Sequence, residues 1–186
     1  MAKLIKQYAA ADASKRVDLI CKNFAIFLGV VDSRTNGILY LIENEKSTNR
    51  RLKNGDLGIR IQTSDRPDPT GNTASSRADI RKALMDCNFS GGVLEDTDNG
   101  DRYMREAFVL KDMRKDYQLF LDQLDLLGED KDLYISFISR KTNIKSIASD
   151  YKIEESSAKS KIYRAKQKIK SEMVSYMMGE IDDEEE

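Results

Sequence analysis

Apolar side chains recur every three or four residues along most of the chain, which is the spacing of one buried helix face. This pattern predicts helices over residues 3–13, 15–31, 38–53, 74–87, 101–127 and 131–141, and a helical pair between residues 144 and 169. Helix stop signals follow two of them, at Asn54-Gly55 and at Gly128. We therefore predict an all-α fold.

Three segments interrupt the helical pattern. Residues 32–37 have turn composition, and residues 57–63 alternate briefly between polar and apolar. Residues 64–73 are rich in Pro, Gly and polar side chains, which predicts an ordered loop.

Residues 89–101 contain glycines and acidic residues, and we interpret this segment as an acidic turn. A calcium loop is the weaker interpretation, with Glu95, Thr97, Asn99 and Glu106 as its ligands. The first ligand of such a loop is normally Asp, and no clear helix precedes the segment at the right distance.

Residues 144–169 have the pattern of a helix-turn-helix. The apolar residues fall on one face of a short helix (Ile144, Ile147, Ala148, Tyr151) and on one face of a longer helix (Ala158, Ile162, Ala165, Ile169). Ala148 supplies the small side chain needed where the helices approach, and Ile153 is expected to fill the corner beneath the turn. The other face of the longer helix is polar and should point to solvent.

A helix-turn-helix that binds DNA places side chains near the start of its second helix against base edges, while lysines and helix N-termini hold phosphates. On this basis the candidate DNA-binding residues are Lys145, Ser156, Ser157, Lys159, Ser160, Lys161, Tyr163, Arg164 and Gln167. Residues 140–172 carry ten Lys/Arg and four Asp/Glu, whereas the whole chain has a net charge of −1. This concentration of positive charge favours DNA binding over a hairpin whose lysines only keep it soluble.

Residues 153–165 resemble the recognition helix of sigma factor region four, the promoter-reading C-terminal domain. Their sequence is Ile-Glu-Glu-Ser-Ser-Ala-Lys-Ser-Lys-Ile-Tyr-Arg-Ala. Lys152 stands where that family usually has a glycine in the turn, and Glu154 stands where a Ser or Asp cap is usual. A non-glycine residue at positive φ costs roughly 1 kcal/mol, so we expect a slightly altered turn.

A second resemblance covers residues 57–64 and 68–74, Leu-Gly-Ile-Arg-Ile-Gln-Thr-Ser and Asp-Pro-Thr-Gly-Asn-Thr-Ala. These segments are similar to the region preceding the sigma-like domain in phage late-gene regulators of the ArpU and RinA type. The resemblance implies that the helix over residues 101–127 leads into the DNA-binding domain and that residues 131–141 support it.

These observations divide the chain into four parts: an N-terminal helical region (1–63), a loop and connecting helix (64–100), a long helix with the helix-turn-helix (101–178), and an acidic tail expected to be disordered (179–186). We expect a sequence-specific transcriptional regulator similar to phage or prophage activators of late genes, acting at a promoter with RNA polymerase. Its main partner is double-stranded DNA. To reach a useful affinity for DNA, a single helix-turn-helix usually needs a second half-site, read by another copy, or a contact with polymerase. The sequence leaves both of these options open.

Two alternatives are a sigma-like initiation factor and an accessory subunit of DNA packaging or nucleic-acid processing. The first needs a promoter-melting domain with exposed aromatic residues, whereas Phe24 and Phe27 fall in a core stripe. The second, as a nuclease, needs clustered carboxylates for metal ions. The close set Asp96, Asp98 and Asp101 is better explained as a turn.

Composition narrows the function classes further. The chain has no His, and Cys21 and Cys87 stand alone without metal-type spacing, which argues against His-dependent triads and zinc chemistry. We therefore expect no enzyme activity, cofactor or metal. No signal pattern or apolar run of about 20 residues is visible, so we expect a protein of the bacterial host cytoplasm with no membrane partner.

Each of two charged clusters in the sequence has two possible interpretations. Lys46, Arg50, Arg51 and Lys53 either form a solvated helix end or make a second phosphate contact. Residues 180–186 carry six carboxylates, which either aid solubility or suppress non-specific DNA binding by covering the basic helix.

Overall fold

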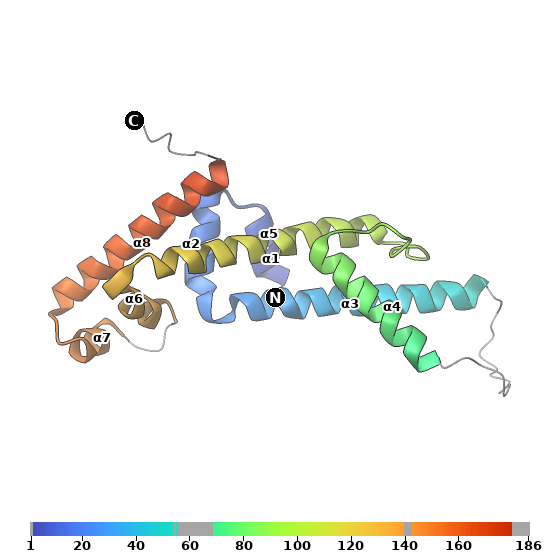
Figure 1. The fold of residues 1–186 in the computed structure, drawn as a ribbon, viewed down its shortest axis with the longest axis horizontal. Helices are drawn as coiled ribbons and strands as arrows, with labels where there is room; N and C mark the ends of the chain where they lie inside the picture. Colours follow the sequence, from blue (N-terminus) through green and yellow to red (C-terminus); the bar gives the residue numbers. More distant parts are fainter. Residues whose placement is uncertain (1, 54, 56–68, 140–142, 180–186) are drawn as a thin grey trace. The chain divides into compact units, whose positions relative to one another are not determined.

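The structure is a computed structural model that describes residues 2–53, 55, 69–139 and 143–179. The elements are α1 (Ala2–Ala9), α2 (Ala13–Asn23), a 3-10 turn η1 (Phe24–Ile26), α3 (Phe27–Lys53), α4 (Pro69–Asp86), α5 (Gly100–Asp125), a 3-10 turn η2 (Gly128–Asp130), α6 (Lys131–Ile138), α7 (Ile144–Asp150) and α8 (Glu155–Met178), as Figure 1 shows. All secondary structure in these residues is helical, which confirms the predicted all-α class. The predictions for residues 57–64 and 180–186 lie outside the described residues.

The chain forms two compact units. Residues 1–30 and 113–186 make one, here called the terminal unit, and residues 31–112 make the other, the central unit. The sequence pattern predicts boundaries at residues 63 and 100 instead. The difference arises because α2 packs against α6 and α8, so the two ends of the chain share one core.

The core of the terminal unit is built from apolar faces of helices far apart in the sequence. Its aromatic part joins α1, α3 and α5: the rings of Phe27 and Tyr117 stack at 5.5 Å between centroids, and Tyr8 meets Phe27 edge-on at 5.9 Å. The Tyr8 hydroxyl donates a hydrogen bond to the buried Asp116 carboxylate, and Arg16 lies 3.8 Å from the same group. Burial of Asp116 is therefore compensated by a donor and a cation.

The central unit packs α3, α4 and α5 around a smaller core. Its buried apolar residues are Val31, Ile38, Leu39, Ile42, Ile80, Ala83, Leu84, Tyr103, Ala107 and Leu110. Arg34 of α3 makes two hydrogen bonds of 2.7 Å with the Glu106 carboxylate of α5. Glu106, the last ligand in the calcium interpretation, is thus part of an ion pair within the unit.

The turn predicted at residues 32–37 is wrong, because α3 runs without interruption through this segment. Val31, Thr35, Ile38 and Leu39 all lie on its buried face, and the Thr35 hydroxyl donates to the Val31 carbonyl at 3.0 Å. Burial of that face outweighs the turn propensity of the Asp, Asn and Gly residues between them.

The loop predicted over residues 64–73 is also wrong from residue 69 onward, where α4 begins. Pro69 is its first residue, a position that proline favours because its fixed φ suits a helix and its missing N–H would have no partner there. The long helix predicted over residues 101–127 is confirmed as α5, and the helix predicted over residues 131–141 is found as α6, which ends at Ile138.

Tyr151, expected on the buried face of its helix, is exposed instead, and two other large apolar residues are also exposed. Phe108 is 51% exposed, Leu28 38% and Tyr151 38%. In α5 the buried positions near Phe108 are Tyr103, Ala107, Leu110 and Met113.

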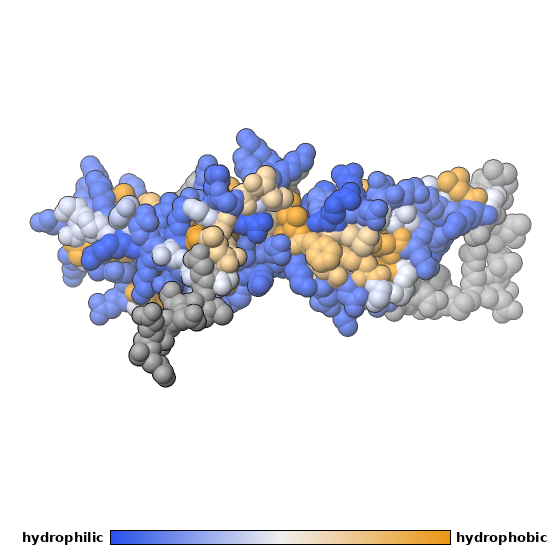
Figure 2. All heavy atoms as spheres, turned by 90° about the horizontal axis from the view of Figure 1, so that it is seen from above, coloured by the Kyte–Doolittle hydropathy of each residue, from blue (hydrophilic) through white to orange (hydrophobic). Residues whose placement is uncertain are grey.

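The face of the molecule shown in Figure 2 is largely hydrophilic, with apolar patches between the charged side chains. By length and composition alone, one helical stretch of the described residues, Ala13–Lys53, could cross a membrane. The core helix of a folded protein passes the same test, and Val17, Ile20, Phe27 and Val31 of this stretch are buried in the protein.

Candidate nucleic-acid interface

The two helices of the predicted motif are α7 and α8, supported by α6 and α2. The side chain of Asn143 begins α7 by accepting a hydrogen bond of 2.8 Å from the Ser146 N–H. Ala148 of α7 and Ala158 of α8 are both buried, and small side chains here allow the two helices to pack closely. Ile153, expected to fill the corner, is half-buried.

The turn between α7 and α8 contains one left-handed residue, Lys152, which is not a glycine. Lys152 has a φ of 52°. Its N–H donates to the Ser149 carbonyl at 3.1 Å, and the Ile153 N–H donates to the Ala148 carbonyl at 2.9 Å. This is the Schellman arrangement that ends many helices. Lys152 thus occupies the left-handed position that a glycine usually takes.

The first turn of α8 has no side-chain cap on its backbone. Glu154 precedes the helix in an extended conformation, and its carboxylate accepts a hydrogen bond of 3.2 Å from the Ser156 hydroxyl instead of from a backbone N–H. The Glu155 Oε2 atom lies 4.0 Å from Lys159 Nζ. The backbone N–H groups at this helix end, together with the helix dipole, suit an anionic oxygen.

α8 has one buried and one exposed face, as its sequence predicts. The buried residues are Ala158, Ile162, Ala165, Ile169 and Met173. Ser156, Ser160, Tyr163 and Gln167 are exposed, and the Tyr163 side chain is 63% exposed. Successive turns of the helix therefore present one polar side chain each on the same side.

The remaining candidate residues lie around this polar face. Ser157, Lys159 and Arg164 of α8 are exposed, and so is Lys145 near the start of α7. Lys161 differs: it is half-buried, and its ammonium donates a hydrogen bond to the Asp130 carboxylate of η2. The structure thus brings the candidates onto one motif but gives Lys161 a partner within the protein.

Two further lysines of α8 are paired with α2. Lys166 Nζ lies 2.9 Å from one oxygen of Asp18, and Lys170 Nζ donates to the other at 2.7 Å. Partial burial by itself would raise the pKa of Asp18, but the contacts with Lys170 and Lys166 outweigh it, and the pKa is lowered. The contact with the Asp18 carboxylate raises the pKa of Lys166.

Sequence reasoning did not assign a role to Asp18 or Asp130. Both carboxylates hold lysines of α8, and Asp18 is 152 residues away from Lys170 in the sequence. No local pattern signals such a contact. As a result, the charge count over residues 140–172 overstates the number of unpaired cations that face solvent.

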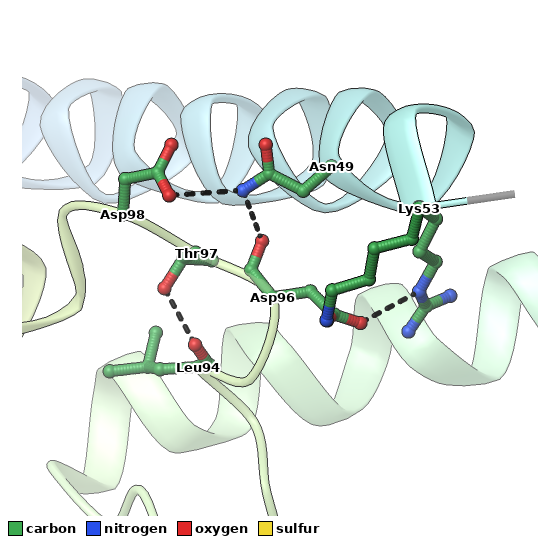
Figure 3. A network of polar contacts seen from close by, with 7 residues as sticks. Asn49, Lys53, Leu94, Asp96, Thr97 and Asp98 are labelled. Carbon is green, nitrogen blue, oxygen red and sulfur yellow. Dashed lines mark hydrogen bonds and ion pairs between the residues drawn. The ribbon is translucent and has the colours of Figure 1, made fainter. Parts of the chain in front are cut away.

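Two of the four basic residues at the end of α3 contact the loop before α5, and Figure 3 shows this region. Lys53 and Arg50 both contact the Asp96 carboxylate, and the Asn49 amide donates to the Asp96 carbonyl at 2.9 Å. Hydrogen bonds from Lys53 and Arg50 lower the pKa of Asp96. Arg50 and Lys53 are thus held by a carboxylate of the protein, which argues against a second phosphate site at these two residues.

Comparison of the chain with protein-family models, with curated proteins and with solved structures finds no match. The candidate interface therefore rests on its sequence pattern and geometry.

Proposed function

We propose that this chain is a sequence-specific DNA-binding transcriptional regulator that reads double-stranded DNA with α7 and α8. The observation that carries the proposal is the division of α8 into two faces. One face is buried in the terminal unit, and the other exposes hydroxyl, amide, aromatic and cationic groups. Such a face provides donors and acceptors for base edges together with charge for the phosphates.

The residues take distinct roles in this proposal. Ser156 and Ser160 lie on the first two turns of α8, where the recognition helix of a helix-turn-helix approaches the bases. Lys159 and Lys145 supply exposed ammonium groups for adjacent phosphates. The uncapped N-terminus of α8 adds backbone N–H donors for a phosphate oxygen.

The further proposal is that the motif is sigma region-four-like and that the protein activates phage or prophage late genes at a promoter with RNA polymerase. The order of residues 153–165 and the left-handed turn at Lys152 support the first part. The second part is supported by sequence resemblance alone. In this proposal the protein acts by recruitment, so it supplies binding surfaces and no chemical step.

Selection from a library of random DNA duplexes tests the proposal. The full chain should enrich one sequence motif, and a Lys159→Ala, Ser160→Ala double variant should not. Lys82→Ala is a matched control, because Lys82 is an exposed lysine of α4 outside the motif. The proposal fails if no motif is enriched or if the double variant enriches the same motif as the wild type.

Footprinting on promoter DNA with and without RNA polymerase tests the activator role. A polymerase adaptor should protect its site at a lower protein concentration when polymerase is present. Equal protection in both conditions would identify a self-sufficient binder instead.

A further inference from the structure

An open cleft of about 1030 Å³ lies in the terminal unit, where α2, α6, α7 and α8 meet. Part of its lining is apolar and comes from Cys21, Phe137, Ile138 and Ile144. The Cys21 thiol is 3.5 Å from the Tyr134 hydroxyl, and burial raises the pKa of both groups, so this wall stays neutral. The cleft therefore has a surface suited to an aliphatic side chain.

Lysines supply the charge of the cleft: Lys22, Lys145 and Lys166 line it. Asp18, the one carboxylate among the described residues that line the cleft, is already held by Lys166 and by Lys170. Lys22 and Lys145 are exposed and form no ion pair within the part of the chain that the structure describes. The two remaining positive charges beside an apolar wall match a peptide that carries an aliphatic residue flanked by carboxylates.

The chain contains one such segment at residues 179–186, Gly-Glu-Ile-Asp-Asp-Glu-Glu-Glu. Ile181 is its aliphatic residue, with Glu180 before it and Asp182 after it. We propose that residues 179–186 of one copy dock in this cleft on a second copy, with Ile181 against the apolar wall and the carboxylates near Lys22 and Lys145.

Chain length argues against docking within one copy. Gly179 follows Lys166, the cleft residue on α8, by 13 positions, which places it roughly 20 Å away along the helix axis. Ile181 can extend only about 7 Å from Gly179. A gap of roughly 13 Å is left, so Ile181 cannot reach the cleft of its own copy.

Docking between copies predicts self-association without DNA, and it does not depend on the proposed DNA binding. Lys145 belongs to both proposals, so the test uses Lys22, which is not a candidate DNA contact. Sedimentation of the full chain in low salt over a range of concentrations measures the association. The wild type should shift from monomer to a larger species as its concentration rises.

Three variants locate the contact. Ile181→Ser should weaken association by at least about tenfold, because it removes the aliphatic anchor. Lys22→Glu should weaken it as well, whereas Lys82→Glu makes the same charge change on α4 and should not. The Lys22→Glu protein should associate again in an equimolar mixture with an Asp182→Lys, Asp183→Lys protein. In this mixture the reversed charge in the cleft of the first protein meets the reversed charge in the tail of the second.

A wild type that remains monomeric at every concentration overturns the proposal. So does association that is unchanged by both Ile181→Ser and Lys22→Glu, because the contact then lies elsewhere. Failure of the charge-reversed mixture to associate, with both proteins folded by circular dichroism, would also contradict it.

Discussion

The backbone N–H of Ile153 donates a hydrogen bond of 2.9 Å to the carbonyl of Ala148, across a turn in which Lys152 is left-handed. This bond satisfies a carbonyl at the end of α7 and sets the direction in which the chain enters α8. The orientation of the proposed reading helix thus depends on a backbone conformation that lysine adopts only at an energetic cost.

Replacing Lys152 by Gly should therefore stabilise the protein relative to replacing it by Ala. Both variants remove the ammonium group, but only Gly relieves the strain of the left-handed conformation. We expect Lys152→Gly to exceed Lys152→Ala by about 0.5–1 kcal/mol in the free energy of unfolding. Urea denaturation measures the difference, and equal midpoints for the two variants would show that the turn is not strained.

The Asp18 contacts predict a pH-dependent stability. The pKa of Asp18 is lower in the folded protein, so its stabilising contribution is present above the unfolded carboxyl pKa of about 3.9. It is lost as the pH falls through the lowered folded value. Because the Asp18 side chain is 42% exposed, we expect Asp18→Asn to cost only about 1 kcal/mol at pH 7.

Urea denaturation of the wild type and Asp18→Asn between pH 7 and pH 2 checks this sign. The two unfolding free energies should differ at pH 7 and converge at acid pH. A constant difference across this range would mean that the carboxylate charge does not contribute.

Close packing of α7 on α8 predicts that Ala158 tolerates no larger side chain. Ala158 is fully buried, so Ala158→Leu should cost about 1–3 kcal/mol through overpacking. Ser157→Leu adds an equally large side chain at the neighbouring exposed position and should change stability by less than about 0.5 kcal/mol. Similar melting temperatures for the two variants would contradict the assigned faces of α8.

The second basic cluster gives a prediction about DNA affinity. Arg50 and Lys53 are held by Asp96, so an Arg50→Ala, Lys53→Ala double variant should bind duplex DNA within about twofold of the wild type. Fluorescence anisotropy with a labelled duplex measures this. A drop of tenfold or more would show that the cluster contacts phosphates.

Local periodicity identified most helices because each buries one continuous face. The pattern of α5 predicts both of its ends within two residues, whereas α8 continues to Met178, nine residues beyond the predicted end at residue 169. The continuity of α3 was missed, since Asn36 and Gly37 favour a turn and only the packing of the central unit overrides them. Local signals also missed the start of α4 at Pro69 and the break between α2 and α3 at Phe24–Ile26.

The exposed face of α8 followed from the helical repeat, but the partners of its lysines did not. Whether Lys161, Lys166 and Lys170 face solvent depends on Asp130 and Asp18, which lie on other elements. The packing of α2 against α8 joins residues from opposite ends of the chain. A periodic pattern within one helix carries no information on contacts between residues that are far apart in the sequence.

The most direct test of the proposed DNA-reading role is the affinity of Lys159→Ala and Ser160→Ala for a duplex that contains the motif selected by the wild type. Both side chains are exposed on the polar face of α8, so neither substitution should shift the melting temperature appreciably. We predict that each costs about 1–3 kcal/mol of specific binding, with a smaller effect of Ser160→Ala on a scrambled duplex. Unchanged affinity for the motif in both variants, with both proteins folded, would contradict the assignment of α8 as the reading helix.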